Sequence, residues 1–213
     1  MTEQKDGAPP RQDGAGGFPA RMDLTTERGG PRYPELIEQM RTLMDNVRYA
    51  CPDESAADDV IALLTAANAR LAPTLVDEWT SPSGTRVDLP SRGDIGLPPY
   101  KIFELGPDGI AAKVTFRRFH IGGNDVAHGG YLALLFDDMA GITAGVHAGR
   151  VCRTAYLTVN YRSLTPLETP LVVRCRVDRR EDRKLFVTGT LQDGDRVCAD
   201  AEGLFIMLRP GQA

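Results

Sequence analysis

The residues best suited to chemistry lie in one segment, residues 128–141, which reads HGGYLALLFDDMAG. Its composition predicts an apolar helix opened by a glycine pair, with the carboxylates of Asp137 and Asp138 inside it. Free N–H groups at a helix start carry the positive end of the helix dipole and can hold an oxyanion. Because an unpaired charge in an apolar setting is very costly, two acids in such a helix indicate a functional role for them. An anion cradle and a carboxylate on one helix together predict a catalytic site.

The two acids differ in their neighbours at helical spacing. The neighbours of Asp137 are small: Gly130, Ala133, Ala140, Gly141 and Ala144. Those of Asp138 are larger and apolar: Tyr131, Leu134, Leu135 and Ile142. A face of small residues can be approached by another backbone or by a ligand, which favours Asp137 as the reacting acid and leaves Asp138 a supporting role. The alternative is that both carboxylates are hydrogen-bonded helix residues or lie at a subunit contact.

Segments of alternating polar and apolar residues surround this helix in the sequence. We predict the helix over 129–147, and strands over 101–105, 110–119, 153–162, 170–182, 185–192 and 196–208. The dipeptide Asp193-Gly194 indicates a hairpin turn between the last two strands. One long helix among about six mostly antiparallel strands predicts an α+β domain. Because the helix is apolar on most sides, the sheet should wrap around it.

The first hundred residues divide into three further segments. Residues 1–32 are rich in Gly and Pro with few large apolar side chains, which predicts a disordered tail. Apolar residues at helical spacing within 33–73 predict a helical hairpin that packs against the main domain. Residues 74–100 hold many Pro, Gly and Ser residues and predict an extended connector, which Trp79 could anchor. The main domain then covers 101–209.

Charge and composition argue against several classes of function. A formal charge of −4 and a pI near 5.4 give no support to nucleic-acid binding. No apolar run approaches a membrane-spanning length, and the two N-terminal helices carry no basic stripe, so we expect a cytoplasmic protein without membrane association. The four cysteines are scattered without a C-x-x-C pair and only three histidines are present, which predicts free thiols and no metal site.

The order of these elements, with His-Gly-Gly at 128–130 and Asp137 nine residues after His128, resembles the hot-dog-fold acyl-CoA thioesterases. The resemblance is narrower for the group that includes the phenylacetate-degradation thioesterases and the mammalian thioesterase-superfamily proteins. Further on it rests on residues 154–161, TAYLTVNY, and residues 183–187, RKLFV. It covers about residues 100–209 and implies a hot-dog fold, in which an antiparallel sheet wraps around one long helix, here with an N-terminal helical extension.

The resemblance also implies roles for individual residues. The amide of Gly129 would polarise the thioester carbonyl, with help from Gly130, as oxyanion donors do where charge develops. Asp137 would activate water as a base or attack the thioester directly. Thr154 matches a hydroxyl position that orients the water, and in a dimer it would come from the facing subunit. The alternative for Thr154 is an ordinary strand threonine.

Four other residues are weaker candidates. His128 has no Ser or Cys partner in a nucleophile motif, so we interpret it as a structural residue where the helix begins. Many relatives carry Asn or Gln six residues before the His, where this chain has Gly122. Asn124 is the candidate for that side-chain amide here, but it lies only four residues before His128. Arg183 and Lys184 match a basic spot that meets coenzyme A phosphates in relatives; a solvated charged turn is the alternative.

These observations favour the hydrolysis of an acyl-CoA thioester to a free acid and coenzyme A, without a metal or redox cofactor. Exposed sheet edges and an incomplete site in one subunit predict a homodimer or a dimer of dimers. The apolar side chains near the helix start favour a medium or long fatty acyl group. The main alternative is a non-catalytic acyl-CoA-binding or regulatory module. A hot-dog dehydratase or hydratase is a third hypothesis, but the Asp and His pair that it would need is missing from the helix.

Overall fold

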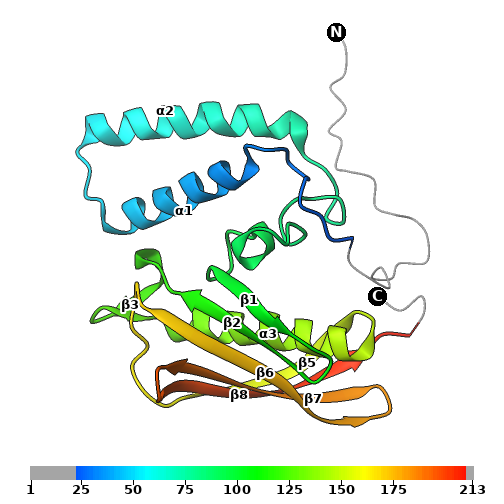
Figure 1. The fold of residues 1–213 in the computed structure, drawn as a ribbon. Coiled ribbons are helices and arrows are strands. Elements are labelled where there is room, and N and C mark those ends of the chain that lie inside the picture. The colour runs from blue at the N-terminus through cyan, green and yellow to red at the C-terminus, as the bar shows by residue number, and fades with distance from the viewer. Residues whose placement is uncertain (1–22, 210–213) are drawn as a thin grey trace.

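Six strands with alternating buried and exposed residues form one antiparallel sheet in the computed structural model, which describes residues 23–209 (Figure 1). The strand order is β1-β2-β6-β7-β8-β5. The bounds are β1 Tyr100–Leu105, β2 Gly109–Thr115, β5 Cys152–Tyr161, β6 Pro170–Glu181, β7 Lys184–Asp193 and β8 Arg196–Met207. All five strand pairings are antiparallel, and β5 is an edge strand of ten residues. The predicted sheet is therefore confirmed, and for five of the six strands no end differs by more than one residue.

The helix α3, Gly129–Ala148, lies across one face of this sheet and forms the core with it. Its buried residues Leu135, Phe136 and Met139 contribute to the same apolar cluster as Leu185 and Phe205 of the sheet. Full burial of each such side chain stabilises the fold by roughly 1.5–3 kcal/mol. Gly149 ends the helix in the left-handed conformation, at φ 66°. The α+β architecture with a sheet wrapped around one helix is that of the expected hot-dog fold.

The second strand ends earlier than predicted. It stops at Thr115, and the predicted remainder to residue 119 turns into the short 3-10 helix η3, Arg118–His120. The Nδ1 atom of His120 accepts the Arg117 N–H at 2.8 Å, and the His120 N–H donates to the Arg117 carbonyl at 3.0 Å. These two bonds fold the chain back on itself. The short strands β3, Ile121–Gly123, and β4, Val126–Ala127, then lead to α3.

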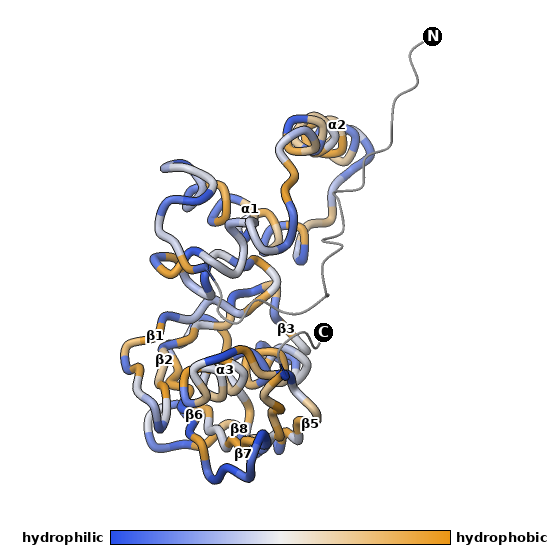
Figure 2. Tube along the Cα trace, turned by 90° about the vertical axis from the view of Figure 1, so that its right-hand side faces the viewer, coloured by the Kyte–Doolittle hydropathy of each residue, from blue (hydrophilic) through white to orange (hydrophobic). Residues whose placement is uncertain are grey.

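The predicted N-terminal helices are α1, Tyr33–Tyr49, and α2, Glu54–Leu71, followed by the short helices η1, Ala72–Thr74, and η2, Pro90–Gly93. Only α1 packs on the domain, where it contacts η3. No residue of α2 is buried, and both views place it on the far side of α1 from the sheet (Figures 1 and 2). The expectation that the hairpin packs as a unit is wrong for α2, because its apolar stripe finds no surface within the described residues.

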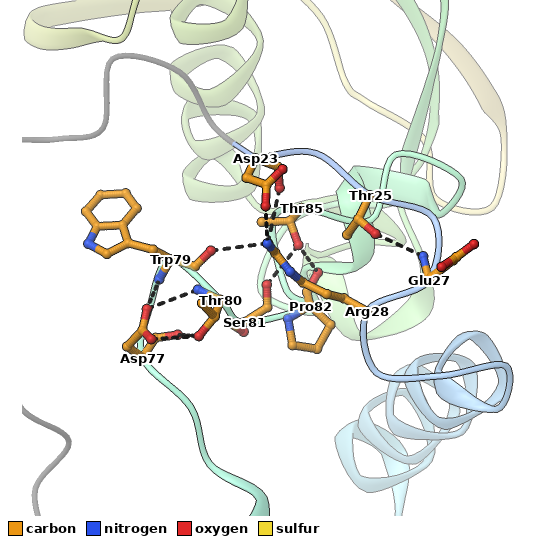
Figure 3. Close-up of polar contacts among 10 residues, drawn as sticks. All are labelled: Asp23, Thr25, Glu27, Arg28, Asp77, Trp79, Thr80, Ser81, Pro82 and Thr85. Carbon is orange, nitrogen blue, oxygen red and sulfur yellow. Dashed lines mark hydrogen bonds and ion pairs between the residues drawn. The ribbon is translucent and has the colours of Figure 1, made fainter.

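Part of the predicted disordered tail is bound to the connector (Figure 3). Residues 1–22 lie outside the described residues, whereas Thr25 bridges Arg86 in parallel and exchanges backbone hydrogen bonds with Thr85 and Val87. The Arg28 guanidinium donates to the carbonyl of Trp79 at 3.2 Å. The boundary at residue 32 is therefore corrected, because segment 23–32 has hydrogen-bonding partners that its composition does not reveal. The anchoring contacts of Trp79 in Figure 3 come from its backbone.

None of the helices within residues 23–209 combines the length and the apolar composition that crossing a membrane needs. All four cysteines are free thiols. Burial raises the pKa of the Cys175 thiol to about 12 and that of Cys152 to about 11, so both are poor nucleophiles.

Candidate active site

Asp137 lies half-buried on α3 and is held by one side chain of the edge strand. The Thr154 hydroxyl of β5 donates to the Asp137 Oδ1 atom at 2.8 Å. In the register of the sheet Thr154 lies beside Phe205 and Leu185, both of which are buried against α3, so it faces the helix as they do. This contact lies within one chain, so Thr154 and Asp137 belong to the same subunit. The threonine therefore orients the carboxylate directly.

The start of α3 offers one free N–H group. The His128 side chain caps the helix, because its Nδ1 atom accepts the N–H of Gly130 at 3.0 Å. Gly130 therefore cannot donate to a substrate while His128 holds it, which removes the expected assistance to Gly129. Gly129 is the first helical residue, so its own N–H has no acceptor within the helix. The Tyr161 hydroxyl donates to the Gly129 carbonyl at 3.0 Å and ties the helix start to β5.

Asp138 forms an ion pair on the other side of the helix. The Arg92 guanidinium of η2 reaches it with two hydrogen bonds, at 2.7 and 3.2 Å, and the Tyr100 hydroxyl donates to the same carboxylate. Burial alone would lower the pKa of Arg92, but the charge of Asp138 raises it above its ordinary value. Burial also raises the pKa of Tyr100, so its hydroxyl stays protonated as a donor. Asp138 is thus compensated, whereas Asp137 forms no ion pair within residues 23–209.

A strained turn aims Arg92 at Asp138. Ser91 and Arg92 both adopt the left-handed conformation, at φ 51° and 55°, which costs roughly 1–2 kcal/mol for each residue with a side chain. The buried Ser91 hydroxyl compensates by donating to the Pro98 carbonyl at 2.5 Å and accepting the Tyr100 N–H at 3.0 Å. Sequence reasoning missed Arg92 and Tyr100, because no local pattern connects them to a helix some forty residues later.

A groove of about 520 Å³ lies beside the start of α3. Gly130 and Leu134 of the helix line it, and Asp137 lies beyond its lining residues, one helical turn after Leu134. Its other lining residues are Arg48, Phe119, Ile121, His128 and Tyr131. The volume is within the range of small-molecule sites, and an apolar lining with few polar groups is typical of them.

The loop before the helix differs from the pattern implied by the resemblance. Asn124 lies exposed at the tip of the β3–β4 turn with φ 50°. Gly122 is the residue that approaches it: a Cβ atom there would lie 2.7 Å from the His128 Cα. Gly122 has no side-chain amide, and the Asn124 side chain makes no hydrogen bond within residues 23–209.

The predicted basic spot lies where β7 begins. Arg183 donates to the Met207 carbonyl at 3.0 Å. Lys184 precedes the buried Leu185, and alternate residues of a strand face opposite sides, so Lys184 points away from α3. A contact of Lys184 with a substrate at Asp137 would have to run around the sheet or come from another subunit.

The thioesterase superfamily model matches residues 124–199, which include Gly129, Asp137 and Thr154. This part of the chain is similar to the thioesterase superfamily. The acyl-coenzyme A thioesterase THEM4 of Rattus norvegicus is 36% identical to this chain over 85 residues, and THEM5 of Homo sapiens is 32% identical over 85 residues. Each match covers 39% of this chain, but only 36% and 34% of those proteins, so the chain matches about a third of the length of these curated relatives.

A solved structure of a thioesterase superfamily protein shares the fold over a longer stretch, with a TM-score of 0.71 and 24% identity. The superposition covers 89% of this chain and 98% of that one. It therefore includes much of the N-terminal extension as well as the thioesterase-superfamily domain. Arg48, Arg92 and Tyr100 lie outside residues 124–199, so the extension adds side chains to the site that the superfamily match does not cover.

Proposed function

We propose that the protein hydrolyses acyl-CoA thioesters to a free carboxylic acid and coenzyme A. The observation that carries this proposal is the Asp137 carboxylate, oriented by Thr154 at 2.8 Å on the helix whose first N–H is free. The similarity of the thioesterase-superfamily domain to acyl-coenzyme A thioesterases supports the same substrate class.

In the proposed reaction Asp137 accepts a proton from a water molecule whose oxygen attacks the thioester carbonyl carbon. The negative charge that develops on the carbonyl oxygen is stabilised by the Gly129 N–H and the helix dipole. Collapse of the tetrahedral intermediate breaks the C–S bond, and the thiolate of coenzyme A takes up the proton. In the alternative, Asp137 attacks the carbonyl carbon directly and the C–S bond breaks to give the same thiolate. Water then hydrolyses the resulting anhydride and restores the Asp137 carboxylate.

The two catalytic groups are too far apart to act on one carbonyl within one chain. Asp137 follows Gly129 by eight residues, and at 1.5 Å of rise per residue this separates them by about 12 Å along α3. A second copy with its helix antiparallel would bring the Asp137 of one chain to the Gly129 of the other. The long exposed edge of β5, which carries Thr154, is a natural pairing surface for such a copy. We therefore propose a homodimer with two shared sites.

The first experiment compares the wild type with Asp137→Asn on a panel of acyl-CoA thioesters, following thiol release. The substitution keeps the Thr154 hydrogen bond but removes the base, and general-base catalysis contributes about 10²–10⁴-fold in rate. An Asn variant with undiminished activity, or a wild type inactive on every thioester, would remove the proposal. The panel also measures the preferred acyl-chain length.

The second experiment removes the Gly129 N–H with Gly129→Pro. Proline is favoured at the first helical position, and His128, at φ −67° and ψ 132°, has the extended conformation that the residue before a proline prefers. Gly129→Ala is the matched control: it adds the same Cβ, which meets the exposed Tyr161 ring at 2.9 Å, but keeps the N–H. We expect the proline variant to lose about 10²–10³-fold more activity than the alanine variant.

Mixing Gly129→Pro chains with Asp137→Asn chains tests the shared site. In a mixed dimer one site carries both substitutions and the other carries neither. After subunit exchange, activity should therefore recover to about a quarter of the wild-type level, since half of the dimers are mixed. Recovery no greater than the sum of the two variants alone would show that each chain works by itself.

A second candidate function is acyl-CoA binding without turnover. The observation that favours it is the small number of oxyanion donors. The His128 side chain holds the Gly130 N–H, and Gly122 has no side-chain amide to donate. Calorimetry that detects tight acyl-CoA binding, together with no thiol release over hours, would favour this alternative.

A further inference from the structure

The N-terminal extension contributes a charged side chain to the groove beside the helix start. Arg48, in the last turn of α1, lines this groove together with residues of the thioesterase-superfamily domain. It is the one cationic side chain among the groove's lining residues, and the aromatic and aliphatic residues Phe119, Ile121, Tyr131 and Leu134 form most of the rest. An apolar groove with one guanidinium at its edge is complementary to a ligand with an apolar segment and one anionic group.

The position of Arg48 is fixed by the contacts of α1 with the domain. Arg117 forms ion pairs with Glu38 at 2.5 Å and with Asp45 at 2.7 Å, and the Phe119 N–H donates to Asp45 at 3.0 Å. Asp45 lies three residues before Arg48 and therefore on the same side of the helix. Phe119 therefore has two roles: its N–H holds Asp45 of α1, and the residue itself lines the groove.

The charge of Arg48 is not used within the described residues. Within residues 23–209 its only hydrogen bond is a long one, 3.4 Å, from the guanidinium to the Ile121 carbonyl, and it forms no ion pair there. The nearby Arg117, in contrast, is paired with two carboxylates, and Arg118 lies 4.3 Å from the centre of the Tyr49 ring. Arg48 thus retains most of its five N–H donors for a ligand.

We infer that Arg48 binds an anionic group of the substrate, so that the N-terminal extension contributes to substrate recognition. This inference rests on the proposed thioester substrate. Carboxylates and phosphates both fit the planar fork of a guanidinium. On a thioester of coenzyme A the anion is either a carboxylate at the far end of the acyl chain or a phosphate of coenzyme A. The apolar part that fills the groove is the acyl chain in the first case and the pantetheine arm in the second.

The test uses Arg48→Gln, whose amide can still donate to the Ile121 carbonyl, and the conservative variant Arg48→Lys. Arg118→Gln removes the same charge from an exposed residue near α1 that does not line the groove. Binding is measured by calorimetry with four hydrolysis-resistant thioethers: an alkyl and an ω-carboxyalkyl group, each on coenzyme A and on pantetheine. Because the readout is binding, its result does not depend on turnover, and thiol release from the parent thioesters is measured separately.

Two results would support the inference. Arg48→Gln weakens both ω-carboxyalkyl probes by about tenfold or more if the anion is an acyl carboxylate, or both coenzyme A probes if it is a phosphate. In either case Arg48→Lys restores part of the affinity and Arg118→Gln changes none. An equal loss for all four probes would show that Arg48 only ties α1 to β3, and no loss for any would show that it is solvated; both overturn the inference. Selective binding without thiol release would instead refute the proposed hydrolysis.

Discussion

At the scale of single residues, two adjacent carboxylates on one helix have different tasks because their partners differ. Asp138 is held by Arg92 and Tyr100, and Asp137 by the neutral hydroxyl of Thr154. A hydroxyl fixes the direction of a carboxylate without supplying a positive charge. The partner, and not the position along the helix, is what distinguishes the two acids.

We predict that Thr154→Val lowers kcat/KM by about 10- to 100-fold, since hydrogen bonds to charged groups contribute about 1.5–3 kcal/mol. Valine has the shape of threonine and suits a strand, so the loss should come from the missing hydroxyl. Steady-state kinetics on the best acyl-CoA of the panel measures it. Thr154→Ser keeps the hydroxyl and should retain most of the activity. Valine kinetics equal to those of the wild type would show that Thr154 is an ordinary strand residue.

At the scale of elements, the short helix η2 links the N-terminal extension to α3. The buried Arg41 of α1 donates to the Pro90 and Asp94 carbonyls at 3.3 and 3.0 Å, and Arg92 extends from the same turn to Asp138. The left-handed turn at Ser91 directs the Arg92 side chain towards Asp138, while carbonyls on either side of the turn accept hydrogen bonds from Arg41. The extension is therefore held against the helix that carries the candidate catalytic acid.

We predict that Asp138→Asn destabilises the protein by about 2 kcal/mol, because it leaves the partly buried Arg92 without a counter-charge. Arg92→Met should have a comparable effect, and the double variant should cost at least about 1 kcal/mol less than the sum of the two. Denaturant unfolding of the four proteins completes the cycle. Strict additivity would mean that the pair seen at 2.7 Å contributes nothing to stability.

Much of this element-scale arrangement could be predicted from the sequence, and the reasons for the rest are physical. Alternation and turn signals located all six strands, and apolar composition located α3, because both patterns are local. Periodicity also located α2, but it identifies an apolar stripe and not the surface that covers it. The pairing of Arg92 with Asp138 and the approach of Arg48 to the groove depend on how distant segments meet, which no local pattern contains. Asp137 and Gly129 were assigned their roles by the resemblance to the thioesterases, and the small neighbours of Asp137 favoured the same choice.

At the scale of the whole molecule, one buried imidazole couples folding to pH. His120 is fully buried between Phe119, Phe116 and Tyr131, and its Nδ1 accepts the Arg117 N–H. Burial lowers its pKa to about 4 from the ordinary 6.5; the charges of Arg117 and Arg41 act in the same direction and that of Asp45 opposes them. The folded protein therefore keeps His120 neutral at pH values where the unfolded chain binds a proton.

We predict that this group contributes stability that is complete above about pH 6.5 and is lost as the pH falls towards 4, by at most about 3 kcal/mol. The sign follows because the unfolded state binds more protons in this window. His120→Asn keeps an acceptor for the Arg117 N–H but does not titrate. Denaturant unfolding between pH 4 and 7 should show a smaller loss of stability for the variant, and identical slopes would contradict the prediction.

The tight contact between Gly122 and His128 also limits how this chain can change. A Cβ atom at position 122 would lie 2.7 Å from the His128 Cα, so the loop in its present conformation has no room for an Asn or Gln side chain there. The backbone of the loop would first have to move, and that movement has no benefit until the new side chain is present. The new side chain and the new loop conformation must therefore arise together. To introduce a side-chain amide at position 122, an engineer would have to exchange residues 121–128 as one block.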